Sequence, residues 1–352
     1  MLYNEDKQIS AKFRKDYFDS IVKMTEMRQA EADRNRAEYI SPGTVAAFRE
    51  EYRKDLTAYI GWPLTEYDSF KDVPVNVRKE KRLDEDFATI WSMQFEVMPG
   101  FWFYGLYLET KNPLDSKPFV IAQHGGAGQP ETICEMWGAS NYSHVPERFA
   151  RKGCNVFCPA LMLWAKEDGP EGVEKYRVFD TNDRDYSDTR LHHVGSSMTA
   201  IEVFAIRRIL SYFISEGIAH EGHIGMAGLS YGGYYTVRTA ALEPKIDAAY
   251  SSCQFSSRYV YEQWPDWIYD GIAHKFLDAE IASLIAPRPL FLEEGDSDDF
   301  FKPEPFLREC ERTLPFYEAQ RAADKLYYRV FKGGHQFAED DEGIDFIMNA
   351  IG

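Results

Sequence analysis

One serine stands where its neighbours could make it a nucleophile. Ser230 lies in the run Gly228-Leu229-Ser230-Tyr231-Gly232, which follows a short apolar segment and precedes a segment compatible with a helix. A serine on such a sharp strand-to-helix turn has a strained backbone, and a glycine two positions to either side lets strand and helix pack closely. The amides that begin the helix favour negative charge at the serine. The pattern predicts a nucleophile elbow, and the alternative is an ordinary glycine-rich turn with an N-cap serine.

A base for this serine is expected on a histidine, because a serine hydroxyl is a poor nucleophile near neutral pH. Among the eight histidines, His335 alone follows the last predicted strand, residues 326–331. Two glycines precede it and form a loop that can carry the imidazole back to the serine. We predict that His335 is the base, and a histidine in a surface loop is the alternative.

An acid that orients the base is expected in the loop after the strand at 290–294. This loop reads Glu294-Gly295-Asp296-Ser297-Asp298-Asp299-Phe300 and offers three aspartates. We predict Asp298, because a Gly-x-x-Asp turn leaves the strand and returns a carboxylate toward the sheet end. Asp296 and Asp299 remain alternatives. The chain order serine, aspartate, histidine matches that of triads on parallel sheets of this type.

Catalysis also needs N–H donors aimed at the developing oxyanion. The backbone N–H of Tyr231, directly after the serine, is one candidate. A second is expected after an earlier strand, where the sequence has His124-Gly125-Gly126. We predict Gly126 as the donor, with Gly125 as the next choice. His124 is expected to hold this loop, and it is also kept as a candidate substrate contact.

Alternating strand and helix patterns must position these residues. Residues 118–123 form a continuous apolar run, typical of a strand that is buried on both faces of a parallel sheet. Further strands are expected at 155–158, 224–229, 246–251, 290–294 and 326–331, with helices near 146–152, 197–215, 234–242, 305–322 and after 339. Such repeated units predict an α/β fold with a mostly parallel sheet flanked by helices and a site at the carboxyl ends of the strands. Residues 73–109 alternate around Pro99-Gly100 and predict antiparallel edge strands.

The first part of the chain reads as two helices, near 10–37 and 44–60, separated by Ser41-Pro42-Gly43. We therefore divide the chain into an N-terminal helical extension, residues 1–62, and a catalytic domain, residues 63–352. The extension carries no catalytic pattern. It is expected to pack on the main domain or on a partner subunit. In the second case these helices would join copies of the chain into a homo-oligomer.

Five segments in order resemble the α/β-hydrolase superfamily, and within it the dienelactone hydrolase and acetyl xylan esterase-like group. They are HGG at His124, GLSYGG at Ser230, LEPKIDAAYSS from Leu242, APRPLFLEEGDSD from Ala286 and GGHQF from Gly333. The resemblance covers residues 118–340 and implies an α/β-hydrolase fold with loop or cap insertions at the catalytic end. It also implies hydrolysis of carboxylic esters without a cofactor, often acetyl or aromatic esters on plant polysaccharides or small molecules.

The resemblance has two departures that leave alternatives open. True dienelactone hydrolases use a cysteine where this chain has Ser230, which argues against that reaction. The segment GLSYGG also resembles the elbow of prolyl oligopeptidase-type peptidases, although no propeller repeats precede it. We expect a serine esterase, most simply one that removes acetyl or feruloyl-type groups from a saccharide. A peptidase or amidase is the first alternative, and a non-catalytic scaffold of the same fold is the second.

Aromatic residues are frequent in two loops expected at the catalytic end, residues 161–194 and 254–276. Trp164, Tyr186, Trp264 and Trp267 are the candidate substrate contacts among them, because an aromatic wall would suit a sugar face or an aryl acid. Alternatively, these rings form the small core of a cap. The acidic run 180–188 is expected to be a solvated loop that Arg184 and Arg190 could fix.

Composition restricts the partners of the chain. The formal net charge is −17, which argues against binding to nucleic acid or to an anionic membrane. No apolar run is long enough to cross a bilayer and the N-terminus is polar, so we expect a cytoplasmic protein.

Five scattered cysteines form no Cys-x-x-Cys pair and are expected to be reduced and mostly buried. We expect no metal and no cofactor.

Overall fold

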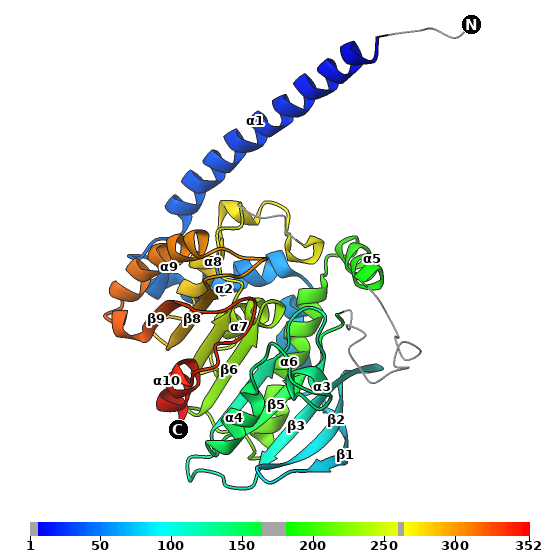
Figure 1. Ribbon diagram of the computed structural model, residues 1–352, viewed down its shortest axis with the longest axis vertical. Coiled ribbons are helices and arrows are strands. Elements are labelled where there is room, and N and C mark those ends of the chain that lie inside the picture. Colours follow the sequence, from blue (N-terminus) through cyan, green and yellow to red (C-terminus); the bar gives the residue numbers. More distant parts are fainter. Residues whose placement is uncertain (1–5, 164–180, 260–263) are drawn as a thin grey trace, which may run out of the picture.

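A nine-stranded sheet forms the centre of the molecule in the computed structural model, which describes residues 6–163, 181–259 and 264–352 (Figure 1). The strand order is β1-β2-β3-β5-β4-β6-β7-β8-β9. The strands are β1 (Asn76–Asp84), β2 (Ala88–Met98), β3 (Phe101–Thr110), β4 (Phe119–Gln123), β5 (Asn155–Pro159), β6 (Ile224–Leu229), β7 (Ala248–Ser252), β8 (Leu290–Gly295) and β9 (Leu326–Phe331). Strands β4 to β9 pair in parallel, whereas β1, β2 and β3 form an antiparallel wing that joins the sheet through β3 and β5. The predicted mostly parallel α/β sheet with antiparallel edge strands is confirmed.

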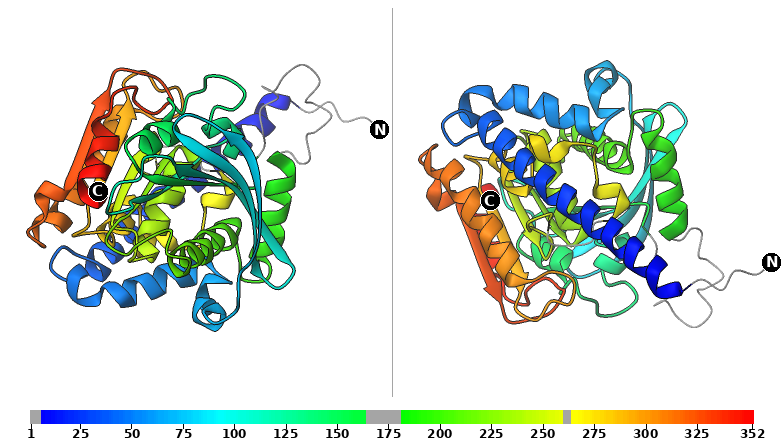
Figure 2. Two further views of the ribbon diagram at one scale, coloured as in Figure 1. Left: turned by 90° about the horizontal axis from the view of Figure 1, so that it is seen from below. Right: turned by 90° about the horizontal axis from the view of Figure 1, so that it is seen from above.

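Helices cover both faces of this sheet (Figure 2). The longer helices are α1 (Lys7–Tyr39), α2 (Val45–Ile60), α4 (Val145–Arg151), α5 (Thr181–His192), α6 (Met198–Ser215), α7 (Tyr231–Leu242), α9 (Pro303–Glu318) and α10 (Glu342–Ile351). The short helices α3 (Pro130–Ile133) and α8 (Asp278–Ser283) lie in connecting segments. Apolar residues of α2, α6, α7 and α9 form one buried cluster with the sheet, and those of α4 and α10 form a second one. The elements therefore make three layers, helix, sheet and helix.

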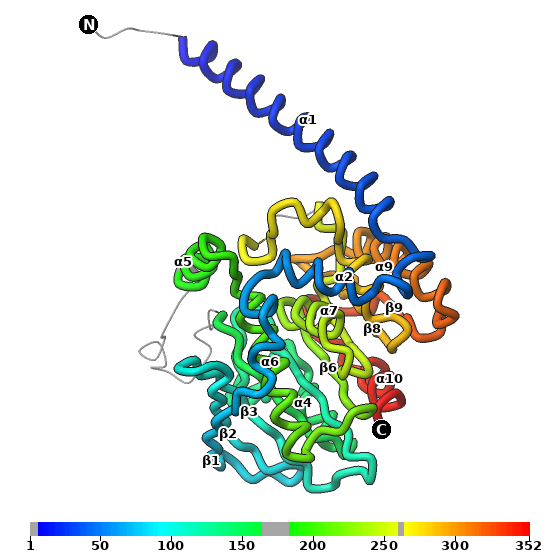
Figure 3. The backbone as a smooth tube through the Cα atoms, turned by 180° about the vertical axis from the view of Figure 1, so that it is seen from behind, coloured from blue at the N-terminus to red at the C-terminus, as the bar shows by residue number. Residues whose placement is uncertain are grey.

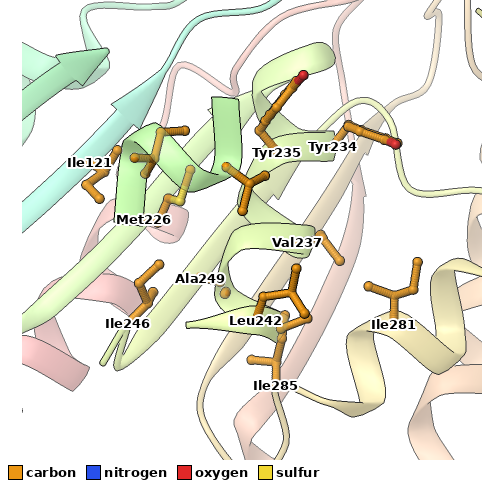
Figure 4. Packing of buried hydrophobic residues seen from close by; sticks show 14 of the residues in the cluster. Ile121, Met226, Tyr234, Tyr235, Val237, Leu242, Ile246, Ala249, Ile281 and Ile285 are labelled. Carbon is orange, nitrogen blue, oxygen red and sulfur yellow. The ribbon is translucent and has the colours of Figure 1, made fainter. Parts of the chain in front are cut away.

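Helix α7 packs over the strands that surround the candidate elbow. Val237 and Leu242 on this helix lie close to Ala249 of β7 and to Ile285 (Figure 4). All twelve residues of α7 are buried, so the helix is fixed by packing on every side. The beginning of α7, directly after Ser230, is held in the same way.

The N-terminal helices differ in how they meet the main body. Helix α2 buries Tyr52, Leu56 and Ile60 in the larger apolar cluster, and Arg53 donates hydrogen bonds to the carbonyls of Ala241 and Leu284. Helix α1, in contrast, projects away from the body for most of its length (Figures 1 and 3). The division of the chain at residue 62 stays a prediction.

Weak local preference is overridden at two places, and the structure corrects the expected secondary structure at the first and confirms it at the second. Residues 181–192, expected within a long polar loop, form helix α5, although their composition carries almost no apolar periodicity. Residues 78–84 are mostly charged and exposed, yet they form β1 because their backbone pairs with β2. In both cases a tertiary partner overrides a weak local preference.

Two further expectations concern cysteines and membranes. All five cysteines are free, and four of them are buried, as expected. In the described part of the chain, every helix is too short or too polar to span a bilayer.

Candidate active site

Ser230 occupies a strained turn between β6 and α7. Its φ is +57° and its ψ is −119°, values that L-residues adopt at a cost of roughly 1–3 kcal/mol. The turn is tight, because a Cβ on Gly228 would lie 2.1 Å from the carbonyl oxygen of Gly232, and a Cβ on Gly232 would lie 2.1 Å from that of Gln123. Both glycines are therefore required for the close packing predicted from the sequence.

His335 and Asp298 form a hydrogen-bonded pair. The imidazole Nδ1 lies 2.7 Å from Asp298 Oδ2, and Asp298 Oδ1 accepts hydrogen bonds from the amides of Phe300 at 2.6 Å and Phe301 at 3.0 Å. The carboxylate is fully buried, whereas the imidazole is partly exposed. Asp298 is thus held by three donors, and only the Nε2 side of the imidazole is left for chemistry.

The other two aspartates of the same loop have different surroundings. Asp296 accepts the N–H of Gly333 at 3.1 Å and ties the loop after β8 to the loop after β9. Asp299 is exposed. Of the three candidates, Asp298 is the one that the structure brings to His335.

The electrostatics of this loop favour a charged Asp298. Burial raises the pKa of Asp298, but the hydrogen bond and charge of His335, together with the amide of Phe301, outweigh it and hold the pKa below its ordinary value. Glu294, at the end of β8, behaves in the opposite way. Burial, and then the neighbouring charge of Asp298, raise its pKa well above the ordinary value. The raised pKa favours the uncharged form of Glu294 beside the charged carboxylate of Asp298.

The loop that carries His335 is fixed by hydrogen bonds to two other loops and to the end of β7. Asn141 Nδ2 donates to the carbonyl of His335 at 3.0 Å, and Ser252 Oγ donates to that of Gln336 at 3.1 Å. Ser297 Oγ donates to the carbonyl of Gly333 at 2.8 Å. The glycine-rich loop is therefore held in a defined position.

The two glycines of the loop after β4 that were predicted as oxyanion donors have different surroundings. Gly126 lines the pocket above Ser230. The N–H of Gly125 already donates to Tyr142 Oη at 2.8 Å, so Gly125 as the next choice of donor is wrong. Gly126 stays the predicted partner of the Tyr231 amide.

His124 holds this loop from below. It is fully buried, Nε2 accepts the N–H of Leu161 at 2.9 Å, and Nδ1 lies 3.0 Å from the carbonyl of Gly125. Burial lowers its pKa to about 4 and keeps the imidazole neutral. The expected structural role fits this geometry, whereas the candidate substrate contact is wrong, because the side chain has no surface to offer.

A pocket of about 650 Å³ opens above Ser230, and its wall includes both Ser230 and His335. The remaining wall residues are Gly126, Ala127, Thr132, Trp137, Gly138, Ala139, Ser140, Asn141, Tyr142, Tyr231, Trp264 and Phe300. None of these wall residues is an aspartate, glutamate, lysine or arginine. The pocket therefore suits an uncharged group with both apolar and hydroxyl surfaces.

The four aromatic residues predicted as substrate contacts do not share one location. Trp264 lies in the pocket wall. Trp267 is 6% exposed and stacks on Tyr234 with ring centroids 4.2 Å apart, so its role as a substrate contact is wrong and it belongs to the small core beneath the wall. Tyr186 is 64% exposed on α5 and is absent from the pocket wall, so it is wrong as well. Trp164 lies outside the described residues.

Sequence reasoning missed the pocket wall formed by residues 127–142. Trp137, Asn141 and Tyr142 belong to this segment, which follows β4 at the catalytic end. Loops 161–194 and 254–276 were chosen because they follow strands at the catalytic end, and the same reason applies to residues 127–142. Phe300, next to the chosen aspartates, was missed for the same reason, and its ring packs edge-on against His335 at 4.9 Å between centroids.

A buried ionic network supports the wall beneath Tyr231. Tyr231 Oη donates to Asp266 Oδ1 at 3.1 Å, and Asp266 Oδ2 is 2.8 Å from Arg184 Nε. Arg184, on α5, also binds both carboxylate oxygens of Glu202 at 3.0 Å. All three charged side chains are buried. The network joins α5 and α6 to the residue that follows the candidate nucleophile.

One group in the described residues has the spacing of metal ligands, and it overlaps the candidate site. Ligand atoms of Cys253, Asp298 and His335 lie within 4.8 Å of one another. The carboxylate and the imidazole are already joined by their hydrogen bond. A metal ion bound to both would have to disrupt that bond, so the arrangement fits proton transfer better than ligation.

Comparison with known proteins places the fold among the α/β-hydrolases. The chain is similar to a glucuronoyl esterase from Solibacter usitatus, with 14% identity, a TM-score of 0.62, and coverage of 86% of this chain and 92% of the other. It is also similar to a Bacteroides fragilis NCTC 9343 structure that is named provisionally as an acetyl xylan esterase, with 14% identity, a TM-score of 0.64, and coverage of 87% and 81%. The chain therefore has the predicted α/β-hydrolase fold.

At the level of sequence, one curated relative was found. A Bacillus subtilis (strain 168) protein, YtaP, whose name assigns it provisionally to the hydrolases, is 24% identical over 65% of this chain and 76% of its own length. No family model matches the chain.

Proposed function

We propose that this protein is a serine hydrolase that cleaves carboxylic esters through an acyl-enzyme. The observation that carries the proposal is the bonded pair of His335 and buried Asp298, which shares one pocket with Ser230 at its strained turn. Because Asp298 binds Nδ1, Nε2 is the nitrogen that can exchange a proton with the serine. The neighbouring esterases and the distant relative support the same class of reaction by analogy.

In the proposed reaction, Ser230 Oγ attacks the ester carbonyl carbon while His335 Nε2 takes the hydroxyl proton. The carbonyl oxygen becomes an oxyanion, which the backbone amides of Tyr231 and Gly126 bind. The intermediate collapses, the ester C–O bond breaks, and His335 returns the proton to the leaving alcohol. Water, deprotonated by His335, then attacks the acyl-enzyme. The bond to Ser230 Oγ breaks, the acid leaves, and His335 returns the proton to Ser230 Oγ. Asp298 stabilises the imidazolium throughout.

We further propose that the substrate is a saccharide that carries an acetyl or feruloyl-type ester. Three wall residues, Trp137, Trp264 and Phe300, offer aromatic surface for a sugar or an aryl group, and Asn141 and Thr132 offer polar contacts for hydroxyl groups. The absence of charged carboxylates and cations among the described wall residues favours an uncharged substrate.

Short-chain p-nitrophenyl esters and a fluorophosphonate test the reaction. We expect turnover of p-nitrophenyl acetate, and a mass increase from a single phosphonyl group that is lost in Ser230→Ala. Ser140→Ala is the matched control, because Ser140 lines the same pocket but its hydroxyl bonds to Glu135 at 2.9 Å. This variant should be labelled like the wild type. Labelling of Ser230→Ala would contradict the mechanism, and a wild type that is neither labelled nor active would favour the scaffold.

The substrate class needs a separate test. Acetylated and feruloylated xylo-oligosaccharides are incubated with the protein, and mass spectrometry measures whether the acyl groups are lost. We expect loss of the acyl group from these saccharides, at a rate unaffected by dialysis against EDTA. Faster cleavage of aminoacyl anilides than of acetyl esters would instead assign the protein to the peptidases.

A further inference from the structure

Helix α1 carries an apolar stripe that nothing in the described chain covers. Its members are Ile9, Phe13, Tyr17, Ile21, Met24 and Met27. Spacings of three and four residues place all six on one face of a helix. Their exposed fractions range from 38% for Ile21 to 71% for Tyr17. Phe18 and Val22, also exposed, widen the stripe on one side.

The opposite face of the same helix is charged. Lys12, Lys15, Asp19, Lys23 and Glu26 follow one another at spacings of three or four residues and lie across the helix from the stripe. Residues 9–27 are therefore amphipathic, with Arg14 as an exception that lies one turn before Tyr17 and Phe18 on the apolar side. An isolated helix of this kind is only marginally stable in water, because most of the stability of helices in proteins comes from packing of the apolar face against a partner.

The C-terminal end of α1, called its root here, is attached to the main body through residues 32–36. Residues 7–31 form the arm that projects beyond it. Arg36 is buried, donates to the carbonyl of Ala273 at 2.6 Å and lies 3.3 Å from Glu280. Asn35 Nδ2 lies 2.8 Å from His274 Nδ1. Ala32 and Arg36 are the buried residues of α1, and both lie in its last third. Residues 7–31 extend beyond this root, a length of roughly 37 Å, which matches the projecting helix in Figures 1 and 3.

We propose that the arms of two copies of this chain pair with each other, antiparallel and stripe against stripe, to form a dimer. A two-fold pair places the same stripe on both partners, so neither copy leaves it exposed. Six to eight side chains at roughly 100 Å² each bury roughly 600–800 Å² per copy, close to the roughly 800 Å² per partner of a stable interface.

Charge along the arm favours the antiparallel direction. Residues 7–15 contain Lys7, Lys12, Arg14 and Lys15 and no acidic residue. Parallel pairing would place these two basic ends side by side. Antiparallel pairing with residue 9 beside residue 27 instead places each basic end beside residues 21–29, whose charged side chains are Lys23, Glu26 and Arg28.

A membrane surface is the competing occupant for such a helix. The charged face, however, carries acidic as well as basic residues, and the whole chain has a net charge of −17. Anionic lipids would attract the tip and repel the body. The charge distribution therefore favours a second copy.

Light scattering after size-exclusion chromatography tests the dimer on the full chain at about 50 µM. We expect twice the mass of one chain for the wild type and a single mass for Tyr17→Asp with Met24→Asp. The matched control is Asp19→Asn with Lys23→Gln on the opposite face, which leaves the net charge of the arm unchanged and should stay dimeric. Circular dichroism and thermal melting show whether the body of each variant is intact, because the arm makes no contact with the core at these positions.

The antiparallel direction of the paired arms is tested by disulfide cross-linking under mild oxidation. Full overlap of two antiparallel stripes places residue 9 of one arm beside residue 27 of the other. Ile9→Cys with Met27→Cys should therefore give a covalent dimer, and Ile9→Cys alone should give none, with the wild type as the control for the native cysteines. A monomeric wild type, or a dimer that survives Tyr17→Asp with Met24→Asp, overturns the proposal. Flotation of a monomer with phosphatidylserine vesicles would overturn it in favour of a membrane surface.

Discussion

At the scale of single residues, the candidate site depends on which donors reach each polar atom. Three aspartates compete in one short loop, and Asp298 differs from the others because two amides and an imidazole bind its carboxylate. The two histidines near the site differ in the same way. His335 is partly exposed and bound on one nitrogen, whereas His124 is buried and bound on both.

Replacement of Asp298 by asparagine should remove activity while it preserves the fold. The amide oxygen can still accept the N–H groups of Phe300 and Phe301, but the amide nitrogen would donate to Nδ1 and force the proton of His335 onto Nε2. A histidine in that tautomer cannot accept the serine proton. We expect kcat/KM for p-nitrophenyl acetate at pH 7 to fall about 10³–10⁴-fold. Asp299→Asn, the control in the same loop, should stay within about twofold, and equal losses in both variants would contradict the assignment.

His124 should make the stability of the protein sensitive to acid. Burial lowers its pKa to about 4 from 6.5, so between these values the unfolded chain binds a proton that the folded protein excludes. The contribution of neutral His124 is complete above pH 6.5 and is lost as the pH falls.

We expect this residue to lower the free energy of unfolding by about 2 kcal/mol between pH 7 and pH 5. Urea unfolding of the wild type and of His124→Gln at both pH values measures it. The glutamine oxygen can accept the N–H of Leu161 and does not titrate, so equal losses in the two proteins would refute the interpretation.

At the scale of elements, helix α5 shows how a segment with weak helical character is held in place. It has little apolar periodicity, but Arg184 points into the body and meets two buried carboxylates. The same network reaches the hydroxyl of Tyr231. A change on α5 should therefore affect both stability and the position of the predicted oxyanion donor.

Replacement of Arg184 by methionine should be strongly destabilising, because it leaves Glu202 and Asp266 buried without their cation. We expect a loss of about 3–5 kcal/mol in the free energy of unfolding, measured by urea titration. Arg190→Met, on the exposed side of the same helix, is the control and should change the value by less than about 0.5 kcal/mol. A stable Arg184→Met protein with unchanged turnover would show that the network supports neither α5 nor Tyr231.

At the scale of the whole molecule, a strongly acidic body surrounds a pocket whose wall, among the described residues, has no acidic or basic side chain besides His335. The field of a net charge of −17 repels anions over distances comparable to the Debye length, about 8–10 Å at physiological salt. We therefore expect anionic substrates to be disfavoured by the net charge of the protein and not by a particular contact.

Salt should consequently change the rates for charged and neutral esters differently. We expect kcat/KM for a p-nitrophenyl ester with a free carboxylate on its acyl chain to rise about three- to tenfold between 20 mM and 300 mM NaCl. The value for p-nitrophenyl acetate should change by less than about twofold. Parallel responses of the two esters would show that the net charge does not govern access to the pocket.

The amino-acid sequence by itself determined the features that depend on local pattern and chain order. The elbow at Ser230 follows from two glycines at fixed spacing, and the parallel sheet follows from alternating strands and helices. The order of strands also restricted the base to His335 and the acid to one loop, because the carboxyl ends of parallel strands meet at one edge. Tertiary structure decided the contacts between loops. It selected Asp298, committed the Gly125 amide to Tyr142, buried Arg184 against Asp266 and left the stripe of α1 exposed. These contacts join residues far apart in the chain, so their geometry depends on how folded loops meet, which no local pattern specifies.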